Sequence, residues 1–109
     1  MIIDFAKISE KTFANFKDGE KNTTIGMYSD DGIKIMRGML EPGASIGYHT
    51  HETNSEIIYI LSGDAKVKYD GEMLDLPCGK AHYCPQGHAH SLINDSDSTV
   101  IFFAAVPEL

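Results

Sequence analysis

GASIGYHTHETNSEIIYILSG, residues 43–63, combines a β-strand pattern with residues that can bind a metal ion. Its second half, Glu56 to Leu61, is rich in Ile and Tyr and has the composition of a β-strand. Glu56 alternates with Ile58 and Ile60, so the three side chains should share one face of that strand. A carboxylate in line with two isoleucines is costly to bury alone. We therefore expect Glu56 either to face solvent or to be held by a bound group.

Two histidines, His49 and His51, precede this strand. Residues i and i+2 of an extended segment point to the same side, so both imidazoles can reach one ion. A third histidine, His90, follows a Pro-Gln-Gly turn and opens another strand-like run. Three imidazoles and one carboxylate suit a divalent transition metal: Mn, Fe, Co, Ni or Zn. Six-coordinate geometry would leave two positions for water or substrate, and a closed tetrahedral zinc site is the alternative.

The remainder of the chain indicates a protein made of many short strands. Gly, Pro, Asn and Asp mark turns at short intervals, and Ile, Val, Tyr and Phe fill the runs between them. Asp70-Gly71 joins two alternating runs, which is typical of a two-residue hairpin. A weak helical pattern is present only over Lys7 to Phe16. Besides Glu56 to Leu61, strands are predicted over Ile33 to Leu40, Ala65 to Tyr69 and Thr99 to Val106.

Composition narrows the classes of partner. The chain has 109 residues, a net charge of −7 and 42% hydrophobic residues, which predicts one globular domain. The negative charge disfavours nucleic acid and anionic membrane surfaces as partners. The N-terminus lacks the features of a signal peptide, and two cysteines are too few for a disulfide scaffold. We therefore expect a cytoplasmic protein with reduced thiols and a small-molecule partner.

The histidine-containing segments resemble the two conserved motifs of the cupin family. The resemblance implies an all-β fold, an antiparallel β-barrel also called a double-stranded β-helix and jelly-roll-like, with a metal at its mouth. It implies one cupin domain over 1–109, with an N-terminal strand or arm in 1–20 and the motifs in 43–94. Carried over by position, it assigns the metal ligands His49, His51, Glu56 and His90. The matches are Gly43-x5-His49-x-His51-x4-Glu56-x6-Gly63 and Gly79-x5-Pro85-x-Gly87-x2-His90-x3-Asn94.

If Glu56 is a metal ligand, a proton-transferring side chain must come from elsewhere. The catalytic candidates are Tyr83, His88 and His82. His88 lies in the turn before His90, so a position on the rim is its alternative. The inward face of the strand that holds His82 cannot be read from alternation, because the bend at Pro85 breaks the count.

Two residues of the strand over 33–40 are candidates for substrate binding. Arg37 could enter the pocket and hold an anionic substrate with two hydrogen bonds. Met39 could line an adaptable apolar pocket. The alternatives are an arginine on the protein surface and a methionine that fills the core.

Three functions remain open, because cupins host many chemistries. The first is an enzyme in which the metal polarises a carbonyl or stabilises an enediolate of a keto sugar, uronate or carboxylic acid. The second is an Fe- or Mn-dependent dioxygenase or oxalate-type decarboxylase. Oxalate-processing cupins carry an arginine three positions before the first metal-binding histidine, where this chain has Ile46. The third is a non-catalytic cupin that binds or senses a small molecule such as a sugar.

A homodimer is also expected. A barrel of 12.0 kDa has a limited core, and such domains gain stability by burying a sheet face against a second copy. The apolar N-terminal residues Ile2, Ile3 and Phe5 are candidates for a docked or exchanged strand.

Overall fold

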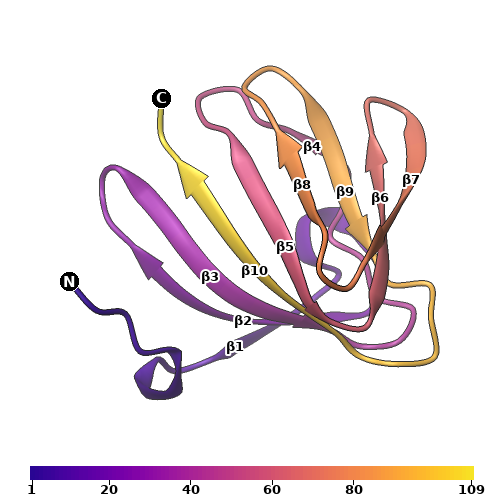
Figure 1. Ribbon diagram of the computed structural model, residues 1–109, viewed down its shortest axis with the longest axis horizontal. Helices are drawn as coiled ribbons and strands as arrows, with labels where there is room; N and C mark the ends of the chain where they lie inside the picture. Colours follow the sequence, from indigo (N-terminus) through magenta and orange to yellow (C-terminus); the bar gives the residue numbers. More distant parts are fainter.

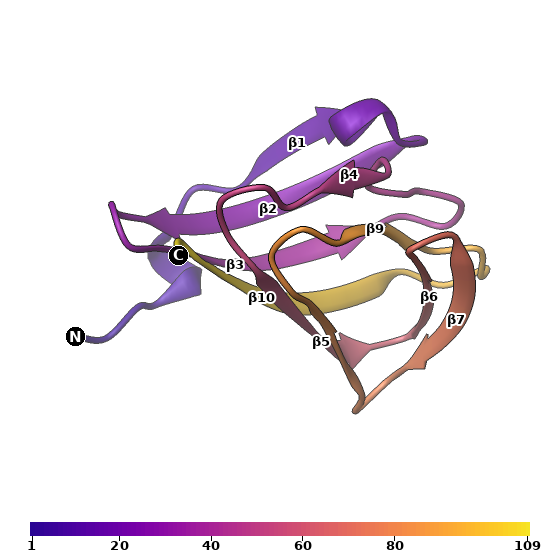
Figure 2. The ribbon, with the colours of Figure 1, turned by 90° about the horizontal axis from the view of Figure 1, so that it is seen from above.

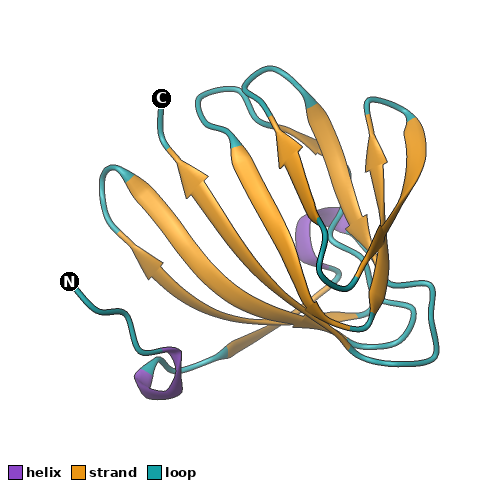
Figure 3. Cartoon of the chain, in the orientation of Figure 1, coloured by secondary structure: helices purple, strands orange, loops and turns teal.

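The computed structural model describes residues 1–109, and its regular secondary structure is almost entirely β-strand (Figure 3). Two single turns of 3-10 helix occur, η1 at Phe5–Lys7 and η2 at Phe16–Asp18. No helix has the length and hydropathy needed to span a bilayer. The strands are β1 Lys11–Ala14, β2 Asn22–Ser29, β3 Ile33–Leu40, β4 His49–Thr50, β5 Glu56–Ser62, β6 Asp64–Tyr69, β7 Glu72–Pro77, β8 Ala81–Cys84, β9 Ala89–Ile93 and β10 Val100–Pro107.

The strands form two antiparallel sheets (Figures 1 and 2). The six-stranded sheet has the order β1-β2-β3-β10-β5-β8, and the four-stranded sheet has the order β4-β9-β6-β7. The last strand of the chain, β10, therefore pairs with β3 on one side and β5 on the other. The all-β prediction and the strands predicted over 33–40, 56–61, 65–69 and 99–106 are confirmed, with small differences at their ends.

The core lies between the two sheets. Phe102 of β10 and Ile58 and Ile60 of β5 come from the larger sheet, and Val67 of β6 and Leu92 of β9 from the smaller one; all are almost fully buried. Glu56 lies on the same inward face as Ile58 and Ile60, as alternation predicted. Its carboxylate is therefore buried and needs partners inside the fold.

The β6–β7 hairpin has the predicted turn. Asp70 and Gly71 both adopt positive φ, 47° and 85°, as the central residues of a type I′ turn do. The flanking residues Tyr69 and Glu72 are paired in register. This hairpin supports β9, because β6 pairs with β9 on its other edge and places Tyr69 opposite His90.

The N-terminal segment differs from the sequence-based expectation. Residues 11–14, within the weak helical pattern, form β1 and pair antiparallel with β2. The side-chain hydroxyls of Thr12 and Thr24 are 2.9 Å apart across this pair. Strand pairing along the edge of β2 thus outweighs the weak helical preference. Ahead of β1, η1 packs on the larger sheet, with the ring centroids of Phe5 and Phe103 6.3 Å apart. Only the first residues project beyond it (Figure 1), and Met1 and Ile2 are 94% exposed.

Candidate metal centre

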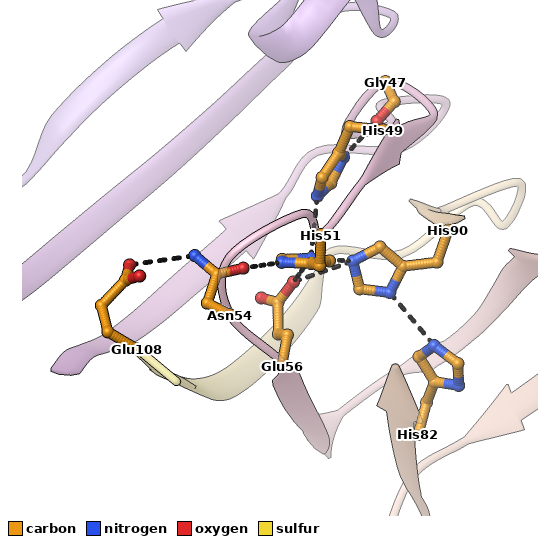
Figure 4. Close-up of polar contacts among 8 residues, drawn as sticks. All are labelled: Gly47, His49, His51, Asn54, Glu56, His82, His90 and Glu108. Carbon is orange, nitrogen blue, oxygen red and sulfur yellow. Dashed lines mark hydrogen bonds and ion pairs between the residues drawn. The ribbon is translucent and has the colours of Figure 1, made fainter. Parts of the chain in front are cut away.

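Four side chains with metal-binding atoms meet between the two sheets (Figure 4). His49 and His90 lie on β4 and β9 and are paired in register. His51 follows β4 directly, and Glu56 is the first residue of β5 in the other sheet. His49 is partly exposed, whereas the other three are buried, His90 to 1% exposure. The structure therefore brings together the four residues that the motifs predict as ligands.

The distances between these atoms fit one metal ion. The Nε2 atom of His51 lies 3.1 Å from Oε1 of Glu56, 2.9 Å from Nε2 of His90 and 3.2 Å from Nε2 of His49. Nε2 of His90 lies 2.8 Å from the same carboxylate oxygen. With metal–ligand bonds of about 2.1 Å, two ligands of one ion lie about 3.0 Å apart in octahedral and about 3.4 Å apart in tetrahedral geometry. The four distances therefore suit donors that share one ion.

The second nitrogen of each imidazole is also engaged. Nδ1 of His49 donates to the carbonyl of Gly47 at 2.7 Å, and Nδ1 of His51 donates to Oδ1 of Asn54 at 2.5 Å. The amide of Asn54 donates in turn to Glu108 at 3.0 Å, which fixes its orientation. Both Nε2 atoms therefore carry the lone pair of their ring, and that of His51 faces the Glu56 carboxylate. Such a convergence of acceptors requires a cation at its centre, a metal ion or a proton.

His82 provides the corresponding contact for His90. Its Nε2 lies 3.1 Å from Nδ1 of His90, on the side remote from Glu56 (Figure 4). Burial lowers the pKa of His82 to about 4, so its ring is neutral and can accept the Nδ1 proton. His82 is thus placed to orient the ring of His90, and it contacts the nitrogen that faces away from the donor cluster.

The pKa values of the cluster suit metal binding near neutral pH. Burial lowers the pKa of His49 to about 4. Burial alone would raise the pKa of Glu56, but hydrogen bonds with His51 and His90 outweigh it and hold that pKa at about 2. The same contact with Glu56 raises the pKa of His51 above its usual value of 6.5. Glu56 is therefore ionised, and a metal bound here must displace the proton that this contact favours on His51.

The four donors open onto a cavity of about 340 Å³. Part of its lining is apolar, with Ile25 and Met27 from β2, Met36 from β3 and Val106 from β10. These residues belong to the six-stranded sheet, whereas His49 and His90 belong to the other. A ligand in this cavity would therefore meet the metal site and an apolar wall together.

The other two catalytic candidates, Tyr83 and His88, do not line the cavity, and neither does His82. Tyr83 is 58% exposed and alternates with buried His82 and Cys84, so it lies on the outer face of β8. His88 lies in the turn before β9, where its Nδ1 contacts Asp70 at 2.5 Å and the Tyr69 hydroxyl at 3.2 Å. The structure thus places Tyr83 and His88 away from the four donor atoms.

Arg37 and Met39, the candidates for substrate binding, are also absent from the cavity lining. On β3 the even-numbered residues point inward, and Lys34 and Met36 line the cavity. Arg37 instead lines a separate groove beside Phe5. The guanidinium of an arginine suits anion binding. Strand alternation, with Gly38 and Leu40 buried, nevertheless decides which side chains of β3 reach the interior.

Sequence reasoning missed Lys17, Lys34 and Asn54. The two lysines line the cavity although they lie outside both motifs. Asn54 lies inside the first motif at a variable position, so its spacing carried no signal for its contact with His51. The buried Ile46 also lines the cavity.

This fold and donor set define a cupin. The family described as "Cupin domain" matches residues 36–106, so the chain belongs to the cupin family. It is 25% identical over 112 residues to a protein of Thermotoga maritima named oxalate-binding protein, a match that covers 97% of this chain and 93% of that one. A germin-like protein of Morus alba is 34% identical over 79 residues, and the match covers 68% of this chain and 38% of the relative.

Solved structures confirm the fold. The crystal structure of a protein described as a predicted oxalate decarboxylase from Thermotoga maritima matches with a TM-score of 0.93 and 24% identity, over the full length of both chains. The two sheets are therefore those of the cupin double-stranded β-helix, as the motifs predicted.

Proposed function

We propose that this cupin binds a divalent transition metal through His49, His51, Glu56 and His90, and that the metal holds the carboxylate of a small molecule. The observation that carries the proposal is the convergence of oriented Nε2 lone pairs and a buried carboxylate within 4.8 Å of one another. A divalent ion with one carboxylate ligand keeps a net positive charge, which attracts an anion into an otherwise acidic protein. The name of the Thermotoga maritima relative supports a carboxylate as the ligand.

Any chemistry would rest on the open positions of the ion. When bound, such a metal polarises a carbonyl or stabilises an enediolate of its ligand. The protein's own contribution is to orient the imidazoles through Gly47, Asn54 and His82 and to bury the carboxylate of Glu56. Metal identity separates the alternatives: Fe with uptake of O2 favours a dioxygenase, whereas Mn, Ni or Zn without uptake favours carbonyl chemistry.

Metal analysis tests the site directly. We expect about one equivalent of a transition metal in protein purified without chelators. His49→Ala and His90→Ala should lose it, because each removes a donor of the cluster. His88→Ala is the matched control, since that histidine lies outside the cluster and should leave occupancy unchanged. Circular dichroism would verify folding, and the partly exposed His49 makes its variant the safer one. Parent-like metal affinity in both donor variants would rule out the site.

We also propose a homodimer formed through the outer face of the larger sheet. The term outer apolar face is used here for Ile57, Tyr59, Leu61, Tyr83 and Phe103. These residues are contiguous, because Ile57 pairs with Tyr83 and Tyr59 pairs with Phe103. All but Phe103 are more than 40% exposed. An exposed apolar surface that spans neighbouring strands is typical of an interface between copies.

A further inference from the structure

The cavity is larger than its metal site needs. Oxalate has six non-hydrogen atoms, whereas cavities of roughly 300 Å³ and above hold ligands of much greater size. The volume here is about 340 Å³. Oxalate bound at the metal would leave the apolar wall of Ile25, Met27, Met36 and Val106 without a partner. A carboxylate with an apolar body would use both parts of the cavity.

One lysine of the cavity has an unusual backbone. Lys17, in η2, adopts a left-handed conformation with φ 52°, and so do its neighbours Asn15 and Asp18 with φ 53° and 64°. Lysine is strained in this region, at a cost of about 1 kcal/mol or more, whereas asparagine and aspartate adopt it more readily. Such strain persists only where the surrounding structure enforces it, and it is concentrated at functional sites.

Two glycines allow this turn to pack closely against residues 45–47. A Cβ atom at Gly47 would lie 1.6 Å from the carbonyl oxygen of Lys17, and one at Gly19 would lie 2.0 Å from that of Ser45. The amide of Gly47 also donates to the carbonyl of Phe16 at 3.0 Å. The η2 turn is therefore held against residues 45–47, immediately ahead of His49. The N-terminal segment in this way becomes part of the metal cavity.

The side chain of Lys17 is placed to act on an anion there. It lines the cavity together with His49 and His51, and its ammonium lies 5.7 Å from the centre of the Phe16 ring. Lys34 lines the same cavity from β3, in the sheet opposite β4. Lys17 is thus the lysine whose turn packs against the segment that leads into His49.

We propose that Lys17 is a ligand-binding residue that pairs with the anionic head of a metal-bound carboxylate whose apolar body, longer than oxalate, lies against Met27 and Met36. This inference rests on the proposed metal-dependent function. It adds a class of ligand, the amphipathic 2-oxo or related carboxylic acids, and a residue that selects it.

Calorimetry with manganese-loaded protein tests the inference through three probes: oxalate, 2-oxobutanoate and 2-oxohexanoate. The two oxo acids share one chelating head, so their difference reports only the apolar wall. Each added methylene should tighten binding about fourfold, so 2-oxohexanoate should bind about 15-fold more tightly than 2-oxobutanoate. Met27→Gln should reduce that ratio while 2-oxobutanoate still binds.

Lysine variants test the anionic contact. Lys17→Gln should weaken both oxo acids about tenfold with their ratio unchanged, and Lys17→Arg should restore the affinity. Lys34→Gln, the matched control, should change affinity less than twofold. Two results would overturn the inference: equal effects of Lys17→Gln and Lys34→Gln, or tighter binding of oxalate than of 2-oxohexanoate. Manganese bound in the same samples would show that the proposed metal site still stands. Absence of manganese from the parent protein would overturn both proposals, and metal analysis of each sample separates these cases.

Discussion

At the scale of single residues, the metal centre depends on groups that do not touch the metal. His51 is held by Asn54, and Asn54 is held by Glu108 near the C-terminus. This chain fixes which nitrogen of His51 carries the proton and where the ring points. Partners of this kind commonly contribute a factor of ten to a hundred to metal affinity.

Asn54→Ala should therefore weaken metal binding by about one order of magnitude or more without removing a ligand. The reason is that His51 would lose the acceptor for its Nδ1 proton and become free to rotate. Competition with a chromogenic chelator measures the affinity. Thr53→Ala is the matched control, because the Thr53 hydroxyl also contacts Glu108, at 3.2 Å, but does not touch His51. Equal affinities for the two variants would contradict this role of Asn54.

Metal binding should release a proton from His51. In the metal-free protein, the hydrogen bond with Glu56 raises the pKa of His51 above 6.5. The proton is therefore bound below that raised pKa and lost as the pH rises through it. We expect metal binding to release a proton at and below pH 6.5 and a smaller fraction of one as the pH rises, with weaker metal binding at acid pH. Binding enthalpies in two buffers of different ionisation enthalpy give this number, and a buffer-independent enthalpy near pH 6.5 would disagree.

The four ligands were predictable because each has a fixed spacing within its motif, and because Glu56 is in phase with two isoleucines. Their supporting residues were not predictable. Asn54 and Glu108 are 54 positions apart, and no local pattern connects them. The position of Arg37 required the inward phase of β3, which a strand with apolar residues on both faces does not reveal.

At the scale of elements, the strands were easier to predict than the turn that completes the cavity. Strands such as β5 and β10 have local signals, namely Ile and Val runs that end at Gly, Pro or Asn. The conformation of η2 has no such signal, because Lys17 belongs to a residue type that rarely adopts positive φ. Contacts with Gly47 impose it from a distant part of the chain.

Lys17→Gly should make the fold more stable and at the same time weaken ligand binding. Glycine adopts positive φ without strain, so the free energy of unfolding should rise by about 0.5–1 kcal/mol. For a chain of this size that is an increase in Tm of a few degrees. The same variant should bind 2-oxohexanoate less tightly, because the ammonium is gone. Lys34→Gly, in an ordinary strand, should lower Tm instead, and calorimetry of all three proteins compares them. A lower Tm for Lys17→Gly would show that the left-handed backbone is not strained.

At the scale of the whole molecule, the two faces of the larger sheet have different roles. The inward face supplies the core and the apolar wall of the cavity, whereas the outward face carries the outer apolar face over β5, β8 and β10. The N-terminal segment lies beside this outward face, where Phe5 contacts Phe103 edge-to-face at 6.3 Å between ring centroids. The first two residues extend beyond it and have almost no contact with their own chain. An apolar sheet face and a projecting apolar segment on one chain are together suited to a symmetric pair.

Tyr59→Glu should convert the dimer into a monomer. Tyr59 lies within the outer apolar face and is 42% exposed, so a glutamate there is tolerated by the isolated chain but would be buried without a partner in the dimer. Light scattering after size exclusion should give twice 12.0 kDa for the parent protein and 12.0 kDa for the variant. Tyr48→Glu is the matched control, because Tyr48 is 48% exposed but lies outside this face, beside Lys68. A parent protein of 12.0 kDa, or a Tyr59→Glu variant that remains dimeric, would exclude the outer apolar face as the interface.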